Sequence, residues 1–288
     1  NAALRHKFKP FVLGVLEAYQ RLPGTPKTQL ILSLDRKDPL HFFPIIEEVA
    51  LSPLGHLLVG VDFCSVEEGF PPKGLAAFLK RFKRFNEVNP DRALALVYHV
   101  GESFNDKSLE SAIRWVVEAA LAGVNRLGHA IALGIDPAHF APHERSELVS
   151  ERRDQIAYDL QFQDGLTRHG VRIDESALRR ELQALSTRPD DERIVCIYDE
   201  KRLRAFGRRQ DFAAEQIAKT QAIIEVCPTS NRRIGGILND GHHPIQRFAK
   251  WGLPFVIASD DPGLFGVTLS EELERACQML GWSTSEKQ

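Results

Sequence analysis

The chain has 288 residues, of which 43% are hydrophobic, and this is enough for one large domain with a substantial core. The 37 basic and 39 acidic residues give a formal net charge of −2, which offers no broad attraction to nucleic acid or to an anionic membrane. Since no apolar run reaches the roughly 18 residues that span a bilayer, and no signal-peptide pattern opens the chain, we expect a soluble cytoplasmic protein that acts on a small polar molecule.

Six short apolar runs have the length and flanking residues of buried strands. They alternate with segments whose apolar residues recur at helical spacing, and this alternation predicts an α/β fold with a parallel sheet. Parallel strands place the groups that follow them at one edge of the sheet. The six runs are residues 29–35, 56–63, 93–99, 126–131, 222–227 and 254–259.

Two amphipathic helices are predicted between the strands. In the first, three phenylalanines between positions 78 and 85 share one face, and the basic residues between them form an opposite face that we expect to be solvated. The second helix spans about 108–122 and has Asp106 or Ser108 as its N-cap. Gly123 is the residue that ends it.

Residues 139–220 differ from the rest of the chain because they are dense in Arg, Glu, Asp and Gln. Two helices are predicted there, around 146–167 and 175–185. This segment interrupts the alternation of strands and helices, so we interpret it as a charged helical insertion. A lid, a partner surface and an oligomer contact all remain open as its role, and its charge runs are most simply a solvated surface.

Three of the predicted strands carry side chains that bind metals or transfer protons. His99 ends the third run, and Glu102 follows it. His129 lies near the end of the fourth run, and Asp260 and Asp261 follow the sixth. Because the ends of parallel strands converge, we expect these residues to form one site. A divalent metal with nitrogen and oxygen ligands suits His99 and Asp260, whereas Glu102 and His129 would move protons around a metal-bound water.

Taken singly, these residues have ordinary structural explanations. A histidine at a strand end is often a hydrogen-bonded structural residue, and an Asp-Asp-Pro sequence is often a turn or a helix cap. The four cysteines are widely spaced and form no Cys-x-x-Cys pair, so we expect reduced thiols. Cys64 and Cys227 end apolar runs and are interpreted as packing residues.

Five motifs together resemble the adenosine/AMP deaminase family, in the same order and over nearly the whole chain outside the insertion. Members of that family are zinc-dependent hydrolases with a TIM (β/α)₈ barrel, and they remove the 6-amino group of adenine nucleosides or nucleotides. The resemblance therefore implies a TIM barrel, a Zn²⁺ cofactor and a small-molecule purine partner. The motifs are His99-Val-Gly-Glu102, Arg126-Leu-Gly-His-Ala130, Cys227-Pro-Thr-Ser-Asn231, His243-Pro244 and Ser259-Asp-Asp-Pro262.

Catalytic roles follow from the resemblance, residue by residue. It implies that His99 and Asp260 bind zinc, and that Glu102, in its protonated form, donates a proton to purine N1. His129 would orient the attacking water and either remove its proton or stabilise the developing charge, and Asp260 would engage the same water. In such a site the metal lowers the pKa of a bound water to about 7, and acid–base groups add about 10²–10⁴-fold.

Two further residues are expected to bind the substrate. The resemblance implies that Asp261 makes a hydrogen bond at purine N7 and that Gly101, beside the catalytic acid, lies against the purine. The sequence leaves adenosine, AMP and ATP open as substrates. Arg36, Arg232 and Arg233 are candidates for contact with a phosphate, although surface arginines are common.

The chain departs from the family in two ways. The family takes two more zinc ligands from a His-x-His pair on its first strand, and no His-x-His occurs in this sequence. The six predicted strands correspond to the third to eighth strands of the family barrel. We therefore expect a portion of a longer polypeptide whose other part supplies the first two strands and the missing histidines. Residues 1–138 and 221–288 would then be the first and last parts of one barrel.

Two function hypotheses follow. In the first, the protein is an enzyme that hydrolyses the 6-amino group of adenosine or an adenine nucleotide to the inosine product and ammonia. In the second, it is a catalytically weak or inactive deaminase-like subunit that forms an oligomeric scaffold through the insertion. Long insertions of this kind resemble those of deaminase homologues in antiphage defence systems. A His-x-His pair in the rest of the polypeptide would favour the first hypothesis.

Overall fold

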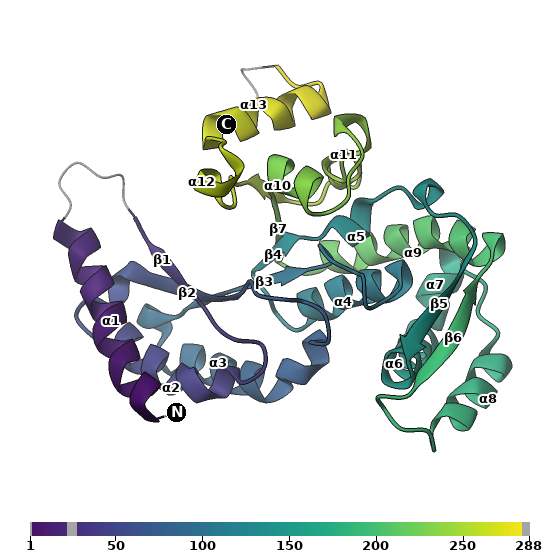
Figure 1. Ribbon diagram of the computed structural model, residues 1–288, viewed down its shortest axis with the longest axis horizontal. Coiled ribbons are helices and arrows are strands. Elements are labelled where there is room, and N and C mark those ends of the chain that lie inside the picture. The colour runs from purple at the N-terminus through teal and green to yellow at the C-terminus, as the bar shows by residue number, and fades with distance from the viewer. Residues whose placement is uncertain (1, 22–27, 284–288) are drawn as a thin grey trace. The chain divides into compact units, whose positions relative to one another are not determined.

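A computed structural model describes residues 2–21 and 28–283 of the chain (Figure 1). The chain divides into two compact units. The first comprises residues 1–99 and 124–126, and the second comprises residues 100–123 and 127–288. Each unit has the α/β character that the sequence predicts.

The first unit is built on parallel strands that alternate with helices. Strand β2 pairs in parallel with β1 on one side and with β3 on the other, and Gly60 of β2 lies opposite Ile31 and Ala95. The elements of this unit are α1 (Ala2–Arg21), β1 (Leu30–Ser33), α2 (Pro39–Ala50), β2 (Leu58–Phe63), α3 (Ala76–Val88) and β3 (Ala95–Val100), with short 3₁₀ turns at Gly55–Leu57, Pro72–Leu75 and Pro90–Arg92.

Aromatic side chains form the core of the first unit. Phe78 of α3 packs edge-on against Phe63 of β2 and Phe43 of α2, with ring centroids 5.2 and 5.0 Å apart. Phe82 and Phe85 are also buried, while the basic residues between them are exposed. The predicted amphipathic helix is therefore confirmed, and its apolar face holds α3 against the sheet.

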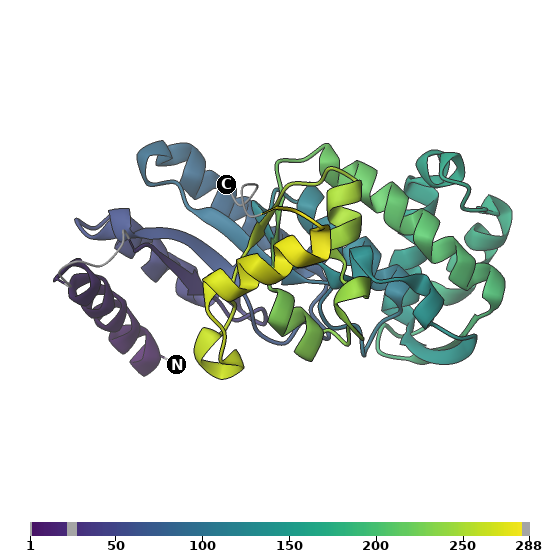
Figure 2. The same ribbon diagram turned by 90° about the horizontal axis from the view of Figure 1, so that it is seen from above.

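In the second unit, three strands carry the ends of the predicted catalytic motifs. Strands β7 and β8 pair in parallel, and β4 precedes β7 in the sheet order. Helix α13, yellow in Figure 2, packs on α10 and α11. These elements are α4 (Leu109–Leu121), β4 (Arg126–His129), α5 (Ile131–Gly134), β7 (Ile223–Val226), α10 (Pro228–Arg233), α11 (Ile245–Lys250), β8 (Phe255–Ile257), α12 (Pro262–Phe265) and α13 (Leu269–Leu280), with 3₁₀ turns at Pro137–His139 and Asp240–His242.

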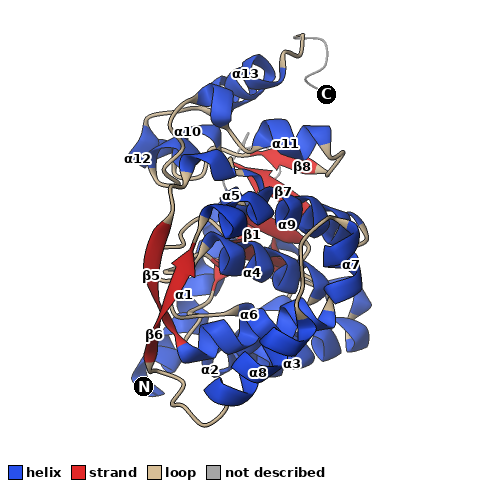
Figure 3. Ribbon diagram, turned by 90° about the vertical axis from the view of Figure 1, so that its right-hand side faces the viewer, coloured by secondary structure: helices blue, strands red, loops and turns tan. Residues whose placement is uncertain are grey.

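The charged segment between β4 and β7 contains more regular structure than the sequence predicts. Its strands β5 and β6 pair antiparallel, with Arg145 opposite Cys196 (Figure 3). The elements are β5 (His143–Leu148), α6 (Val149–Gln161), α7 (Gln163–Arg168), α8 (Glu175–Leu185), β6 (Arg193–Tyr198) and α9 (Glu200–Ala218). The helix predicted at 175–185 is confirmed. The helix predicted from residue 146 is wrong at its start, because 146–148 pair with β6 and the helix begins at Val149.

All six predicted strands are present, as β1, β2, β3, β4, β7 and β8. The helix predicted at 108–122 is confirmed as α4, and Ser108 is its N-cap, since the Ser108 hydroxyl accepts a hydrogen bond from Ser111 N at 3.1 Å. Gly123 follows this helix with a φ of 92°, a conformation that favours glycine. None of the described helices is both long and apolar enough to cross a membrane.

Candidate active site

Three strands of the second unit deliver potential ligand or acid–base groups to one place. His129 ends β4, Cys227 follows β7, and Asp260 lies just beyond β8. A ring nitrogen of His129, the Sγ of Cys227 and a carboxylate oxygen of Asp260 all lie within 4.8 Å of one another. His129 and Cys227 are buried, and Asp260 is half-buried. The convergence expected for His129 and Asp260 is therefore seen within this unit.

The backbone at this place is in an unusual conformation. Among the described residues other than glycine, positive φ angles occur at His129 (64°), Ala130 (47°) and Asp260 (54°). Such residues cost on the order of 1–3 kcal/mol each and persist only where the surrounding structure holds them. Hydrogen bonds from Ala130 N to Val100 O at 3.2 Å, and from Ala132 N to Gly101 O at 2.8 Å, hold the turn after β4. Strained backbone thus coincides with two of the predicted catalytic residues, and this supports the choice of this place as the candidate site.

Glu102 lies beside His129. The distance from His129 Nε2 to Glu102 Oε2 is 3.5 Å, and the Glu102 side chain is 19% exposed, against 2% for His129. The carboxyl group is thus shielded from most solvent. The two predicted proton-transfer residues therefore lie side by side, and their roles stay a prediction.

Asn231 fixes the orientation and the protonation of the His129 ring. Its Oδ1 accepts a hydrogen bond from Cys227 N at 3.2 Å, so its Nδ2 faces His129 Nδ1 at 2.8 Å. An amide nitrogen only donates, and His129 Nδ1 must therefore accept. In neutral His129 the proton then resides on Nε2, the nitrogen that faces Glu102.

From the sequence, Asn231 has no predicted role beyond its place in the Cys227-Pro-Thr-Ser-Asn231 motif, and this contact was missed. The available signal was its position four residues after Cys227, where its side chain folds back on the strand end. Cys227 itself is confirmed as a packing residue with 1% exposure. Burial raises the pKa of the Cys227 thiol, and the charges of Glu225 and Asp260 raise it further.

Gly101 is required by the packing of the turn that precedes Glu102. Its φ is 71°, and a Cβ atom at this position would lie 2.7 Å from Val116 Cγ2 and 3.3 Å from Ala132 Cβ. Only glycine lets this turn lie so close to α4 and α5. The contact of Gly101 with the substrate stays a prediction.

The remaining predicted residues are placed as follows. Asp261 is exposed and stands at the N-cap position of α12. His99 belongs to the first unit, where its Nδ1 lies 3.1 Å from Asp62 Oδ1. A carboxylate on one ring nitrogen is the usual surrounding of a metal-binding histidine. Each of His99 and Asp260 offers a donor atom of a type that zinc accepts, and their part in a zinc site stays a prediction.

Of the arginines considered for phosphate contact, Arg36 is the best defined. It is 3% exposed, and its guanidinium donates to the carbonyl oxygens of Phe63 at 2.6 Å and His99 at 2.7 Å. The guanidinium carbon also lies over the Tyr98 ring, 4.6 Å from the ring centroid. Arg36 thus binds the ends of β2 and β3 together, and this structural role accounts for its position.

His243, from the His-Pro motif, is 2% exposed. Burial lowers its pKa to about 4, so it is neutral at neutral pH, and its Nδ1 accepts a hydrogen bond from Ile245 N at 3.2 Å. The adjacent Pro244 packs tightly on Gly134, where a Cβ would lie 2.6 Å from Pro244 Cβ. This motif secures the start of α11 against α5.

Parts of the chain are similar to known deaminases. Residues 210–288 match the family model for adenosine deaminase. A 65-residue stretch is 40% identical to an aminodeoxyfutalosine deaminase of Streptomyces coelicolor, covering 23% of this chain and 17% of that protein. A longer stretch of 222 residues is 25% identical to an adenine deaminase of Saccharomyces cerevisiae, covering 76% of this chain and 55% of the yeast protein.

Among solved structures, a crystal structure of arabidopsis ADAL complexed with IMP is similar over 97% of this chain and 58% of that chain. The TM-score is 0.50 and the sequence identity 15%, so the likeness concerns the fold. The chain thus spans little more than half the length of these longer-matching proteins. The family match begins within α9 and contains Cys227, Asn231, Asp260 and Asp261.

Proposed function

We propose, from the premise that residues 210–288 belong to the adenosine deaminase family, that the protein containing this chain hydrolyses the 6-amino group of an adenine-type purine and releases ammonia. The observation that carries the proposal is the cluster of Glu102, His129, Asn231 and Asp260, in which His129 and Asp260 both lie on strained backbone at strand ends. Both sequence relatives are deaminases by name.

Glu102 is the proposed proton donor. Hydrolysis at C6 of a purine becomes easier when the ring nitrogen beside it is protonated, because the carbon is then more electrophilic. Glu102, partly shielded and beside His129, holds such a proton and donates it to N1. A positioned acid of this kind contributes about 10²–10⁴-fold to the rate.

His129 is the proposed hydrogen-bond donor to the oxygen that attacks C6. The sequence leaves two roles open for it, a base and a stabiliser of charge. With Nδ1 accepting from Asn231, the Nε2 of neutral His129 already carries a proton and has no lone pair for another. The contact with Asn231 therefore supports the stabilising role, in which Nε2–H donates to the developing negative charge.

His99 and Asp260 are the proposed zinc ligands, and the two compact units would belong to one TIM (β/α)₈ barrel. A zinc ion, when bound, supplies a water whose pKa is lowered to about 7. Asp260, on its strained turn, would hold the metal and orient a water toward C6. Asp261 at the start of α12 and Gly101 beside Glu102 are proposed to bind the purine.

Ammonia release from adenine, adenosine, AMP and ATP tests this function, using the complete polypeptide that contains the chain. We expect one of these substrates to be deaminated. Glu102→Gln is expected to lower the rate by about 10²–10⁴-fold, because the amide cannot supply the proton. Glu144→Gln makes the same chemical change at an exposed position of β5 and is the matched control.

Equal rates in the native protein and in Glu102→Gln would contradict the proposed acid. Absence of ammonia with all four substrates, from protein that carries zinc and melts cooperatively, would contradict deamination and favour the scaffold hypothesis. Metal content by mass spectrometry accompanies the assay. Asp260→Asn is expected to bind less zinc, since it loses the charged oxygen donor.

A further inference from the structure

A cavity of about 760 Å³ lies in the second unit, away from the proposed catalytic residues. Residues of α6, α8, β6 and α9 line it, together with the loop that precedes α8. Its lining includes none of Glu102, His129, Asn231 or Asp260. Cavities of about 300–1,000 Å³ are of the size that accommodates a small organic ligand.

The lining of this cavity is rich in positive charge. It contains seven basic and four acidic side chains, although the chain as a whole has a formal net charge of −2. Arginine predominates, and its planar guanidinium group suits the recognition of phosphate oxygens. The basic residues are Arg152, Arg172, Lys201, Arg202, Arg204, Arg208 and Arg209.

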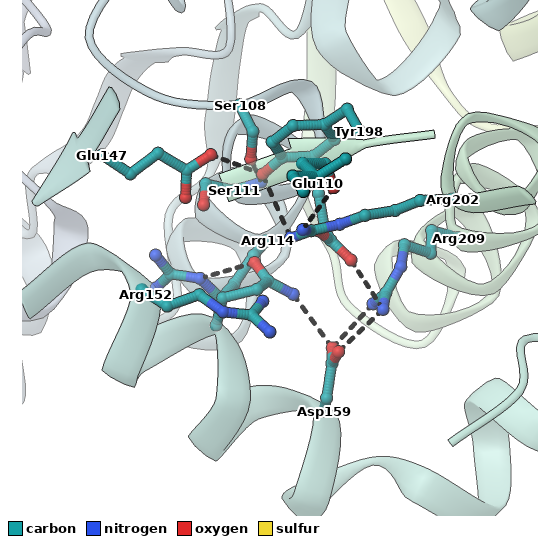
Figure 4. Close-up of polar contacts among 12 residues, drawn as sticks. Ser108, Glu110, Ser111, Arg114, Glu147, Arg152, Asp159, Tyr198, Arg202 and Arg209 are labelled. Atoms are coloured by element: carbon teal, nitrogen blue, oxygen red, sulfur yellow. Dashed lines mark hydrogen bonds and ion pairs between the residues drawn. The ribbon is translucent and has the colours of Figure 1, made fainter. Parts of the chain in front are cut away.

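Two of the four carboxylates are buried and balance the deepest arginines (Figure 4). Asp159 accepts a bidentate contact from Arg209 at 2.6 and 2.7 Å, and Glu110 lies 2.7 Å from both Arg202 and Arg209. Burial alone would raise the pKa of Glu110, yet the two arginines lower it to about 2. The wall of the cavity is therefore a fixed, charged framework, and Arg209 Nε is buried within it without a hydrogen-bond partner among the described residues.

The other two carboxylates cap helices. Asp174 accepts a hydrogen bond from Ala177 N at the start of α8, and Asp199 accepts one from Arg202 N at the start of α9. Their charge is thus directed to backbone N–H groups at the helix N-termini. Neither forms an ion pair with a lining cation among the described residues.

Three cations at the mouth of the cavity are left without a carboxylate partner in the described part of the chain. Arg208 donates to the carbonyl oxygen of Gly170, and no ion pair involves Arg172 or Lys201. All three side chains are exposed. A second hollow of about 860 Å³ shares Arg172 and Lys201 with the first and continues over the loop before α8. These cations therefore face a space that is open to a ligand.

From this arrangement we propose that the cavity binds a small phosphorylated molecule, at a site separate from the purine-binding site. Arg172, Lys201 and Arg208 supply the positive charge that binds the phosphate oxygens at the mouth, and the paired arginines and carboxylates behind them keep the wall rigid. A phosphate group supplies the negative charge and the acceptor oxygens that suit these three cations. The phosphate group is the chemistry that is recognised, whether it belongs to an inorganic oligophosphate or to a nucleotide.

Calorimetric titration of the complete polypeptide with pyrophosphate, and separately with ATP, tests the proposal. We expect saturable binding of pyrophosphate that Arg172→Glu/Lys201→Glu weakens at least tenfold. Both residues are exposed, so the fold is expected to persist, as the melting temperature will show. Arg180→Glu reverses the charge of another exposed arginine on α8, outside the lining, and is the matched control.

The outcomes separate the sources of the phosphate. Binding of both ligands that depends on Arg172 and Lys201 supports a general phosphate site, and such binding of ATP alone identifies a nucleotide site. Pyrophosphate and ATP binding that the double variant leaves unchanged would overturn the proposal, as would an equal loss in Arg180→Glu. Absence of saturable binding for both ligands would overturn it too. None of these readouts requires deaminase activity.

Discussion

At the scale of single residues, Asn231 makes two hydrogen bonds whose directions determine the state of His129. Because its Oδ1 accepts from Cys227 N, its Nδ2 is the group presented to the imidazole. Both side chains are nearly inaccessible, with 1% exposure for Asn231 and 2% for His129. Solvent therefore offers no substitute for the amide, and the ring orientation depends on it.

Replacing Asn231 by Asp is expected to reverse the tautomer of His129. The carboxylate presents only acceptors, so the imidazole proton moves to Nδ1 and Nε2 loses the hydrogen that we propose it donates. Deamination is expected to slow by at least about tenfold. Nitrogen-15 NMR of labelled imidazole rings distinguishes the two tautomers, and His129→Gln identifies the resonance.

Asn231→Leu provides the second variant for this test. It removes the amide at similar volume and is expected to leave a mixture of tautomers. If His129 kept its proton on Nε2 in Asn231→Asp, the hydrogen-bond argument would be wrong. Faster deamination by Asn231→Asp would support the alternative role of His129 as a base.

At the scale of elements, α9 connects the charged segment to the turn beside the candidate active site. Gln210 donates to the carbonyl oxygens of Ala132 at 2.9 Å and Ile135 at 2.7 Å, and these residues belong to α5 and its C-cap. The adjacent Arg209 binds Asp159 of α6 and Glu110 of α4. Two consecutive residues of α9 thus contact α6 of the charged segment and the helices α4 and α5 that precede it.

Breaking the Arg209 pairs is expected to destabilise the second unit. Arg209→Met leaves Asp159 and Glu110 with fewer partners in a buried environment, and removing one partner of a buried pair costs about 3–5 kcal/mol. Arg204→Met on the same helix removes an exposed ion pair with Glu200, which is worth about 0–1 kcal/mol. Urea unfolding measures both, and equal losses of stability would contradict the argument.

The sequence predicts these elements unevenly, for physical reasons. The six predicted strands and α4 have strong apolar patterns, and all are found. Strand β5 has the sequence HERSEL, with hardly any apolar alternation, so only its pairing with β6 makes it a strand. Strand β6 has a recognisable β-branched run, RIVCIY, but it lies within the segment that was interpreted as a charged helical insertion, outside its two predicted helices. Tertiary pairing outweighed local composition there.

At the scale of the whole molecule, the sequence motifs predict which residues form the candidate site, but not the contacts and backbone conformation within it. Glu102, His129 and Asp260 come from three distant segments, and their convergence in the second unit could be predicted because parallel strands end together. The contact of Asn231 with His129, the positive φ angles and the arginine-lined cavity depend on long-range packing. No local pattern encodes them.

The position of His99 and the role of the charged segment belong to the same scale. His99 lies in the first unit with Asp62, and its part in a zinc site stays a proposal. An oligomer contact through residues 139–220 also stays a prediction. The matched relatives are longer than the stretches they share with this chain, so activity is a property to be measured on the complete protein.

The most direct test of hydrolytic deamination is the origin of the oxygen in the product. The complete polypeptide is incubated with its purine substrate in water labelled with oxygen-18, and the product is examined by mass spectrometry. We predict one labelled oxygen at C6 and one ammonia for each product molecule, both dependent on Glu102. A product without label, or a labelled product formed equally well by Glu102→Gln, would contradict the account.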